Sequence, residues 1–296
     1  MNDTGSTSSL FKLTVPGDVN FKVTATGSKA AEGAAVKTST VKAYGINLSG
    51  SKNGTDEATL GSVTGTVTLN NGAATDPDPD EGGSIAAGIL VQTSADLTST
   101  GDVDLTVTAN GTEGNNSVDT LYALGMAAIE DSHIQVNGNA TIKTAVNPVA
   151  GTDGYDTFAA VALEAAVVGS TINLGTDGAG NSLNTTVQLE GGVLAVQGGT
   201  VNLTLDNSAS YLQGNVYTTS FEGRTIPAGT VNLVVANGAT WRPVYDNRNG
   251  DFNNGTLNHA PGYTVTENSI DTLTLQDGGI VDLTWDNPTR SSEFRT

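Results

Sequence analysis

The chain has no cysteine among its 296 residues, and aromatic residues make up only 5% of the total. The first absence excludes a disulfide framework, a thiolate metal site and a cysteine nucleophile. It suits a chain that crosses an oxidising compartment unfolded, and it equally suits a cytosolic chain. The second absence argues against a wide compact core, whereas a narrow core of stacked layers needs mainly Val, Leu, Ile and Ala.

Basic residues are also scarce. The chain carries 12 Lys and Arg against 31 Asp and Glu, a formal net charge of -19. Residues 53–223 contain twenty of these acidic side chains and a single basic one, Lys143. Nucleic acids and anionic membranes are bound through basic patches that release counterions, so we expect neither as a partner.

Long apolar runs are missing. No segment approaches the ~20 consecutive apolar residues that span a bilayer. Residues 1–10 lack the basic and apolar regions of a signal peptide. We therefore expect that this chain is not itself inserted into a membrane.

Catalytic signatures are absent as well. The sequence contains no Gly-x-Ser-x-Gly elbow, no phosphate-binding glycine loop and no His-Glu-x-x-His zinc pair. The carboxylate pairs Asp102 with Asp104 and Glu130 with Asp131 could in principle form a glycosidase dyad, but no aromatic platform accompanies the first pair. We expect no enzyme activity and no cofactor.

Three segments interrupt the regular pattern, at residues 75–81, 147–157 and 246–263. The alternating aspartates of the first segment could supply oxygen ligands for calcium. The prolines between them break the glycine-turned geometry of an EF-hand loop, however, and the sequence therefore predicts solvated loops and no metal site.

The main feature that the sequence does contain is a repeat. Short segments rich in small residues begin at positions spaced by 43, 37 and 37 residues, namely Ala43, Ala86, Ala123 and Ala160. Alternating strands that begin with glycine follow with a similar step, at 65–69, 101–105 and 138–142. The pentapeptide Gly-Thr-Val-Asn-Leu then occurs twice, at 199–203 and 229–233. Such self-similarity is typical of a solenoid, in which each unit buries its apolar face by stacking on its neighbours.

Within one unit the pattern predicts three short strands, at residues 121–129, 133–136 and 139–145. Short connections turn the chain to the next face and return it one layer higher. The sequence therefore predicts an all-β, parallel β-helix of roughly eight three-strand coils. We expect one domain, with an N-terminal coil or cap over 1–40, regular repeats over 41–240 and C-terminal coils over 241–296.

The small-residue segments suggest an association surface. If their larger side chains, such as Tyr44, Ile46, Leu124 and Met126, face the core, the small residues face outward and form a flat, uncharged strip. The strip consists of Ala43, Gly45, Ala86, Gly88, Ala123, Gly125, Ala160 and Ala162. We expect it to dock against a second copy of the rod or a loop of its own chain; the alternative is that small residues only relieve crowding at a corner.

A resemblance to a known family is carried by the C-terminal third. Residues 229–241 (GTVNLVVANGATW), 269–283 (SIDTLTLQDGGIVDL) and 294–296 (FRT) resemble the pertactin-like, AIDA-type passenger of bacterial type V autotransporters. The resemblance covers roughly residues 195–296 by motif, and the upstream repeats match only in style. It implies a right-handed β-helix that is exported through the outer membrane and displayed on the bacterial cell surface, anchored by a C-terminal barrel that this chain does not include.

The same resemblance suggests the function. The protease and esterase members carry Gly-Asp-Ser-Gly and Gly-Asp-Ser-Leu motifs, and neither string occurs here. An adhesin or self-associating rod is the leading interpretation, with a host glycan, a matrix protein or a second copy as partner. The alternatives are a β-helical enzyme that degrades polysaccharides and a passive stalk. The candidate ligand residues are the aromatic and basic cluster Trp241, Arg242, Tyr245 and Arg248, in which Trp241 could instead cap the last coils.

Overall fold

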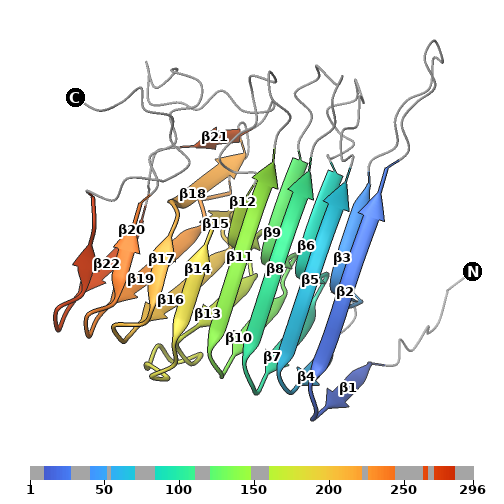
Figure 1. The fold of residues 1–296 in the computed structure, drawn as a ribbon, viewed down its shortest axis with the longest axis horizontal. Helices are drawn as coiled ribbons and strands as arrows, with labels where there is room; N and C mark the ends of the chain where they lie inside the picture. Colours follow the sequence, from blue (N-terminus) through green and yellow to red (C-terminus); the bar gives the residue numbers. More distant parts are fainter. Residues whose placement is uncertain are drawn as a thin grey trace, which may run out of the picture.

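The fold of the described chain is built only from strands. The computed structural model describes residues 10–27, 41–51, 55–70, 84–110, 121–147, 160–221, 226–243, 263–265 and 270–283, and every regular element in these ranges is a β-strand. Figure 1 shows the strands side by side along the long axis of the molecule, in the order of the sequence. The repeats of the sequence are thus stacked layers of one solenoid.

Three sheets form the sides of the solenoid, and we call them A, B and C. Sheet A contains, in spatial order, β1 (Lys12–Val15), β4 (Asp56–Leu60), β7 (Ala95–Ser99), β10 (His133–Val136), β13 (Thr171–Leu174), β16 (Thr200–Leu205), β19 (Thr230–Val235) and β22 (Thr272–Leu275). Sheet B contains β2 (Val19–Thr26), β5 (Val63–Asn70), β8 (Val103–Asn110), β11 (Ala140–Asn147), β14 (Val187–Glu190), β17 (Tyr211–Gln213), β20 (Thr240–Arg242) and β23 (Ile280–Val281). Sheet C contains β3 (Lys42–Ser49), β6 (Ser84–Gln92), β9 (Leu121–Ile129), β12 (Ala160–Ala166), β15 (Gly192–Val196), β18 (Val216–Phe221) and β21 (Tyr263–Val265).

Each coil contributes one strand to each sheet, in the chain order A, B, C. Neighbouring strands pair in parallel throughout, except that β21 pairs antiparallel with β18 at the end of sheet C. Sheets A and B each hold eight strands. The predicted parallel β-helix of roughly eight three-strand coils is therefore confirmed.

Apolar side chains from all three sheets fill the interior. The two pentapeptides lie on β16 and β19 and stack in register, with Asn202 opposite Asn232. The inward residues Val201 on β16 and Val231 on β19 are fully buried, as the alternation of the sequence predicts. The same alternation predicts that Thr204 faces water, and this is wrong, because only 5% of its surface is exposed.

The alignment of the repeats needs one correction. Residues 65–69, 101–105 and 138–142 all belong to sheet B, but Gly65 lies opposite Leu105 and not opposite Gly101. The true counterpart of Gly101 is Gly61, whose carbonyl accepts a hydrogen bond from the Gly101 N–H at 3.3 Å, and a Cβ built at Gly138 would clash with the backbone of Gly101. The pentapeptides lie on sheet A and are a different strand of the unit.

Sheet C contains an irregularity that repeats in successive coils. The register joins Ala87 to Leu124 and Ile89 to Met126, and the residue between them on each strand is skipped. The alternation of inward and outward side chains is therefore not continuous across the skipped position. Ala86 and Ile89, three residues apart, both face the interior, whereas Ala87 and Leu90 pack in a separate cluster. The alternation thus reverses at the skipped position of each strand, which is Gly45, Gly88, Gly125 or Ala162. Between β12 and β15 the register itself shifts at this point, as at a β-bulge.

This reversal overturns the predicted orientation of the small-residue strip. Three of its alanines are buried in one cluster with Val67 and Val107 of sheet B, namely Ala43, Ala86 and Ala123. Ala162 is fully buried in the main core. A Cβ at Gly45 would strike Phe21, one at Gly88 would lie 3.1 Å from Leu105, and one at Gly125 would strike Ile142. Ala160, which pairs with Ala123, is half-buried.

The small residues therefore line the interior where sheets B and C approach, and the strip does not form an outward surface. Of the side chains assigned to the core, Ile46, Ile89, Val91, Met126 and Leu163 do pack there. The remainder pack outside it, in the separate cluster on sheet C, namely Tyr44, Leu124 and Val161.

Candidate ligand surface

The three sheets present different outer faces. The outer face of sheet A carries an asparagine ladder, in which Asn202 donates to Asn173 and Asn232 donates to Asn202 at 2.8 and 2.9 Å. The outer face of sheet C carries the separate apolar cluster, whose members Ala87 and Ala127 are fully buried. The outer face of sheet B is polar and accessible, so it is the first place to search for a ligand surface.

Among the described strands of sheet B, the outward positions hold one aromatic side chain, Tyr211 on β17. Outward positions on the earlier strands are mainly Thr and Asn, as in the alternating segments of β5 and β8. The other aromatic residue of this sheet's C-terminal half, Trp241 on β20, points inward and packs in the core. Tyr211 is therefore the natural centre of a candidate site.

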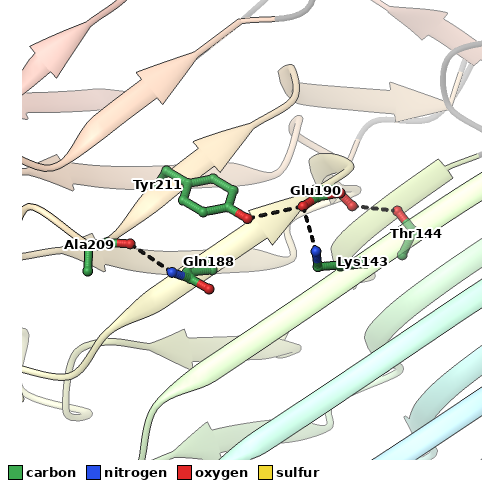
Figure 2. Close-up of polar contacts among 6 residues, drawn as sticks. All are labelled: Lys143, Thr144, Gln188, Glu190, Ala209 and Tyr211. Carbon is green, nitrogen blue, oxygen red and sulfur yellow. Dashed lines mark hydrogen bonds and ion pairs between the residues drawn. The ribbon is translucent and has the colours of Figure 1, made fainter. Parts of the chain in front are cut away.

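Two charged residues from earlier coils meet Tyr211. Its hydroxyl donates a hydrogen bond to Glu190 Oε1 at 3.0 Å, and Lys143 Nζ lies 3.0 Å from the same oxygen. Figure 2 shows the Tyr211 hydroxyl and the Lys143 ammonium converging on Glu190. On the other side, the Arg242 guanidinium carbon lies 5.9 Å from the centroid of the Tyr211 ring, at the limit of a cation–π contact.

Backbone contacts hold this arrangement in place. Parallel pairing puts Lys143 beside Glu190 and Gln188 beside Tyr211. Thr144 Oγ1 donates to the Glu190 carbonyl at 3.0 Å, and Gln188 Nε2 donates to the Ala209 carbonyl at 3.0 Å, as Figure 2 shows. We call the outward set Lys143, Gln188, Glu190, Tyr211, Gln213 and Arg242 the tyrosine patch.

The electrostatics of the tyrosine patch keep its donors protonated. Burial raises the pKa of Tyr211, and its hydrogen bond to Glu190 raises it further. The hydrogen bond and the negative charge of Glu190 raise the pKa of Lys143. At neutral pH the patch therefore holds a neutral phenol, an ammonium and a carboxylate that binds both.

Several polar groups of the patch remain available. The Gln188 side chain uses its NH2 group in the bond to Ala209, which leaves its carbonyl oxygen as an acceptor. The Gln213 amide forms no hydrogen bond within the part of the chain that the structure describes. Arg242 Nε is buried and lies 3.9 Å from Asp282 Oδ2, too far for a hydrogen bond, so only the terminal NH2 groups of Arg242 remain for a ligand. These groups are flat or planar and lie around one aromatic ring.

The predicted ligand cluster is only partly related to this patch. Trp241 is 5% exposed, and its Nε1 donates to the Gly214 carbonyl at 3.0 Å, so it stabilises the last coils from inside. Arg242 faces outward and belongs to the patch, whereas Tyr245 and Arg248 lie outside the described residues.

Sequence reasoning missed Tyr211 and Glu190, because they belong to different coils and only the register places them together. The one available signal was Lys143, the lone basic residue of the central stretch. Its position across from Glu190 could not be read from spacing, since the coils between β11 and β17 differ in length.

The carboxylate pairs considered for catalysis make structural hydrogen bonds. Asp102 Oδ1 accepts bonds from the Asn139 backbone and side-chain nitrogens at 2.8 and 3.1 Å. Glu130 accepts one from Thr93 Oγ1 at 2.9 Å. Within the described ranges, no group of three or more His, Asp or Glu side chains is placed to hold a metal ion. The acidic segment 75–81, considered for calcium, lies outside those ranges.

Comparison with known proteins identifies no relative. No family model matches the chain, no curated protein matches it, and no solved structure matches it. In the described part of the chain, no helix is long and apolar enough to cross a membrane. The function must therefore be argued from the surfaces of the solenoid.

Proposed function

We propose that the chain is a passenger of the autotransporter type that acts as an adhesin without catalysis, displayed on a bacterial surface. The observation that carries the proposal is the outer face of sheet B, a polar surface that continues from β2 to β20. A long rod with such a face binds through many weak contacts, and many displayed copies multiply their effect. Its ligand is a host glycan or a matrix protein.

The acidic charge narrows the ligand further. A net charge of -19 repels polyanions over a distance set by the Debye length, which is about 30 Å at 0.01 M salt. Binding by general charge attraction would need the opposite balance, so contact must come from local chemistry on the rod. This supports a neutral glycan or protein surface over nucleic acid or an anionic membrane.

Self-association through the small-residue strip loses its support, because those residues are interior. A second copy of the rod is still a candidate partner, and an experiment must distinguish self-association from binding of a host ligand. Sedimentation velocity of the chain over about a hundredfold range of concentration, at low and physiological salt, makes this separation. We expect a monomer throughout, and association that strengthens with salt would instead favour a rod that binds its own copies.

The decisive test is adhesion of the folded chain. Beads coated with residues 1–296 are expected to bind cultured epithelial cells or immobilised matrix proteins more than beads coated with albumin do. Heat-denatured chain on the beads is the control for adhesion that needs the fold. Equal binding by all beads would overturn the adhesin, and a passive stalk would then be the better description.

The enzyme alternative has its own measurement. Incubation of the chain with acidic and neutral polysaccharides, followed by a reducing-end assay, is expected to yield no product. Accumulation of reducing ends would replace the binding proposal with a β-helical polysaccharide-degrading enzyme.

A further inference from the structure

The tyrosine patch has the composition of a small ligand site. We infer that it is a subsite for a neutral saccharide, which stacks its apolar C–H face on Tyr211 and hydrogen-bonds its hydroxyls to the surrounding side chains. The inference rests on the proposed adhesin function and names the ligand class of that surface. It comes from the geometry of β11, β14, β17 and β20 alone.

The ring is held ready for stacking. Its hydroxyl is fixed by Glu190 Oε1 at 3.0 Å, and that carboxylate is fixed in turn by Lys143 at 3.0 Å. Figure 2 shows the ring reaching along the sheet toward Glu190. An aromatic side chain has few rotatable bonds, and a ring already held in place loses little further entropy on binding.

The polar groups around the ring match sugar hydroxyls. A hydroxyl is both donor and acceptor, and two neighbouring hydroxyls fit a planar amide, carboxylate or guanidinium group. Gln188 offers an acceptor, Gln213 offers a whole amide, and Arg242 offers its terminal NH2 groups. An apolar surface with a few fixed polar groups is the usual make-up of a small-molecule site.

The charges favour a neutral sugar over a charged one. Lys143 is paired with Glu190, and Arg242 faces Asp282 with 3.9 Å between Nε and Oδ2. With Asp282 beside the patch, two acids and two bases thus nearly cancel at this site. An anionic sugar would gain little locally and would meet the acidic charge of the rest of the rod. A protein ligand would need a larger contact surface than this patch provides.

The test is a binding screen with the folded chain 1–296. Immobilised neutral oligosaccharides, including lactose, cellotriose and maltotriose, are compared with sulfated and sialylated oligosaccharides. The strongest neutral binder is then titrated in free form against the wild type and four variants: Tyr211→Ala, Tyr211→Phe, Gln213→Ala and, as matched control on the same face, Thr106→Ala. Thermal melts of all variants verify that each is folded.

We expect a neutral oligosaccharide to bind and Tyr211→Ala to weaken it at least tenfold, because the stacking surface is removed. Tyr211→Phe keeps the ring and should retain binding within about threefold. Gln213→Ala, which leaves the ring and its support intact, should weaken binding severalfold, and Thr106→Ala should leave it unchanged. The affinity should stay within about twofold between low and high salt, since no net charge is engaged.

Three results would overturn the inference. The first is a neutral binder whose affinity is the same in Tyr211→Ala and Gln213→Ala as in the wild type. The second is binding only to sulfated or sialylated sugars that salt abolishes. The third is adhesion to cells or matrix with no binding to any sugar of the panel. In the last case the adhesin proposal stands and the saccharide subsite fails; absence of adhesion as well would remove both.

Discussion

The outer faces of sheets B and C belong to the same coils and yet differ in kind. On sheet C, Leu90, Ala127 and Glu164 lie next to one another along one row of adjacent strands, and the two apolar ones are buried. On sheet B, the corresponding outward rows carry Thr, Asn and charged residues that reach solvent. The central strands β6 and β9 of sheet C are thus buried on both faces over most of their length, whereas a strand of sheet B is buried on one.

This difference explains why the two sheets read differently in the sequence. Strands with one buried face alternate apolar and polar residues, and β5 and β8 do so cleanly. Strands buried on both faces become nearly continuous apolar runs, as β6 is. A continuous run carries no information about which side chain faces the core.

The largest loss of stability is expected from a substitution in the interior between sheets B and C. Ala123→Lys places an ammonium where the native side chain is fully buried, among Ala86 and Val107. Burying an unpaired charge is expensive, and we expect a loss of at least about 3 kcal/mol or a failure to fold. Thermal unfolding followed by circular dichroism measures it, with the milder Ala123→Ser as the variant that should still fold.

Thr106→Lys on β8 is the matched control for this substitution. Thr106 is exposed on the outer face of sheet B, so the same new side chain should shift stability by less than about 0.5 kcal/mol. If Ala123→Lys melted at the wild-type temperature, the position would face outward and the small-residue strip would again be a candidate association surface.

A smaller effect on stability is expected from Glu164, the one carboxyl on the described strands of sheet C. Glu164 lies between Ala127 and Leu194 on the neighbouring strands, and burial raises its pKa from 4.5 to about 7. Between these values the folded chain holds a proton that the unfolded chain has lost. Stability therefore falls as pH rises from 4.5 to about 7 and stays lower above that.

Glu164→Gln removes this penalty. We expect the variant to be more stable than the wild type by about 2 kcal/mol at about pH 8, and the difference to shrink by about pH 5. Urea unfolding at both pH values measures it. Asp104→Asn, an exposed acid on sheet B, should show no such gain. A Gln variant that is less stable at the higher pH would mean that the carboxylate has a partner in the folded chain.

The fold was predictable because its signals are local. The three strands of the unit over 121–146 were predicted nearly to the residue, since turns at Glu130-Asp131-Ser132 and Asn137-Gly138 punctuate them. The repeat then implied stacking, and stacking implied parallel sheets. Each step used neighbours in sequence or a fixed period.

The faces of sheet C and the tyrosine patch were not predictable for the opposite reason. The reversal of alternation at Gly88 and Gly125 changes the phase of a strand by one residue, and an apolar run on both sides conceals the change. Tyr211 and Lys143 reach the same oxygen of Glu190 only after the irregular segment between β13 and β14 has been absorbed into the coil. Contacts between coils of unequal length need coordinates.

The smallest change in stability is expected for Glu190 on sheet B, which we compare with Glu164 on sheet C. Its pair with Lys143 is solvated, with the two side chains 36% and 49% exposed, so water and salt screen it. A double-mutant cycle of Lys143→Ala and Glu190→Ala should give a coupling of about 0.2–1 kcal/mol that falls as salt rises. Tyr211→Phe is the control, since it removes the hydroxyl bond and leaves the ion pair.

A coupling that is larger than this range and unaffected by salt would mean that the tyrosine patch is shielded from water. The two outer faces would then differ less than their exposure indicates, and the patch would be a poor place for a ligand. A weak, salt-sensitive coupling would sharpen the contrast, because Glu190 would then orient Tyr211 on an open surface while Glu164 is held in an apolar one.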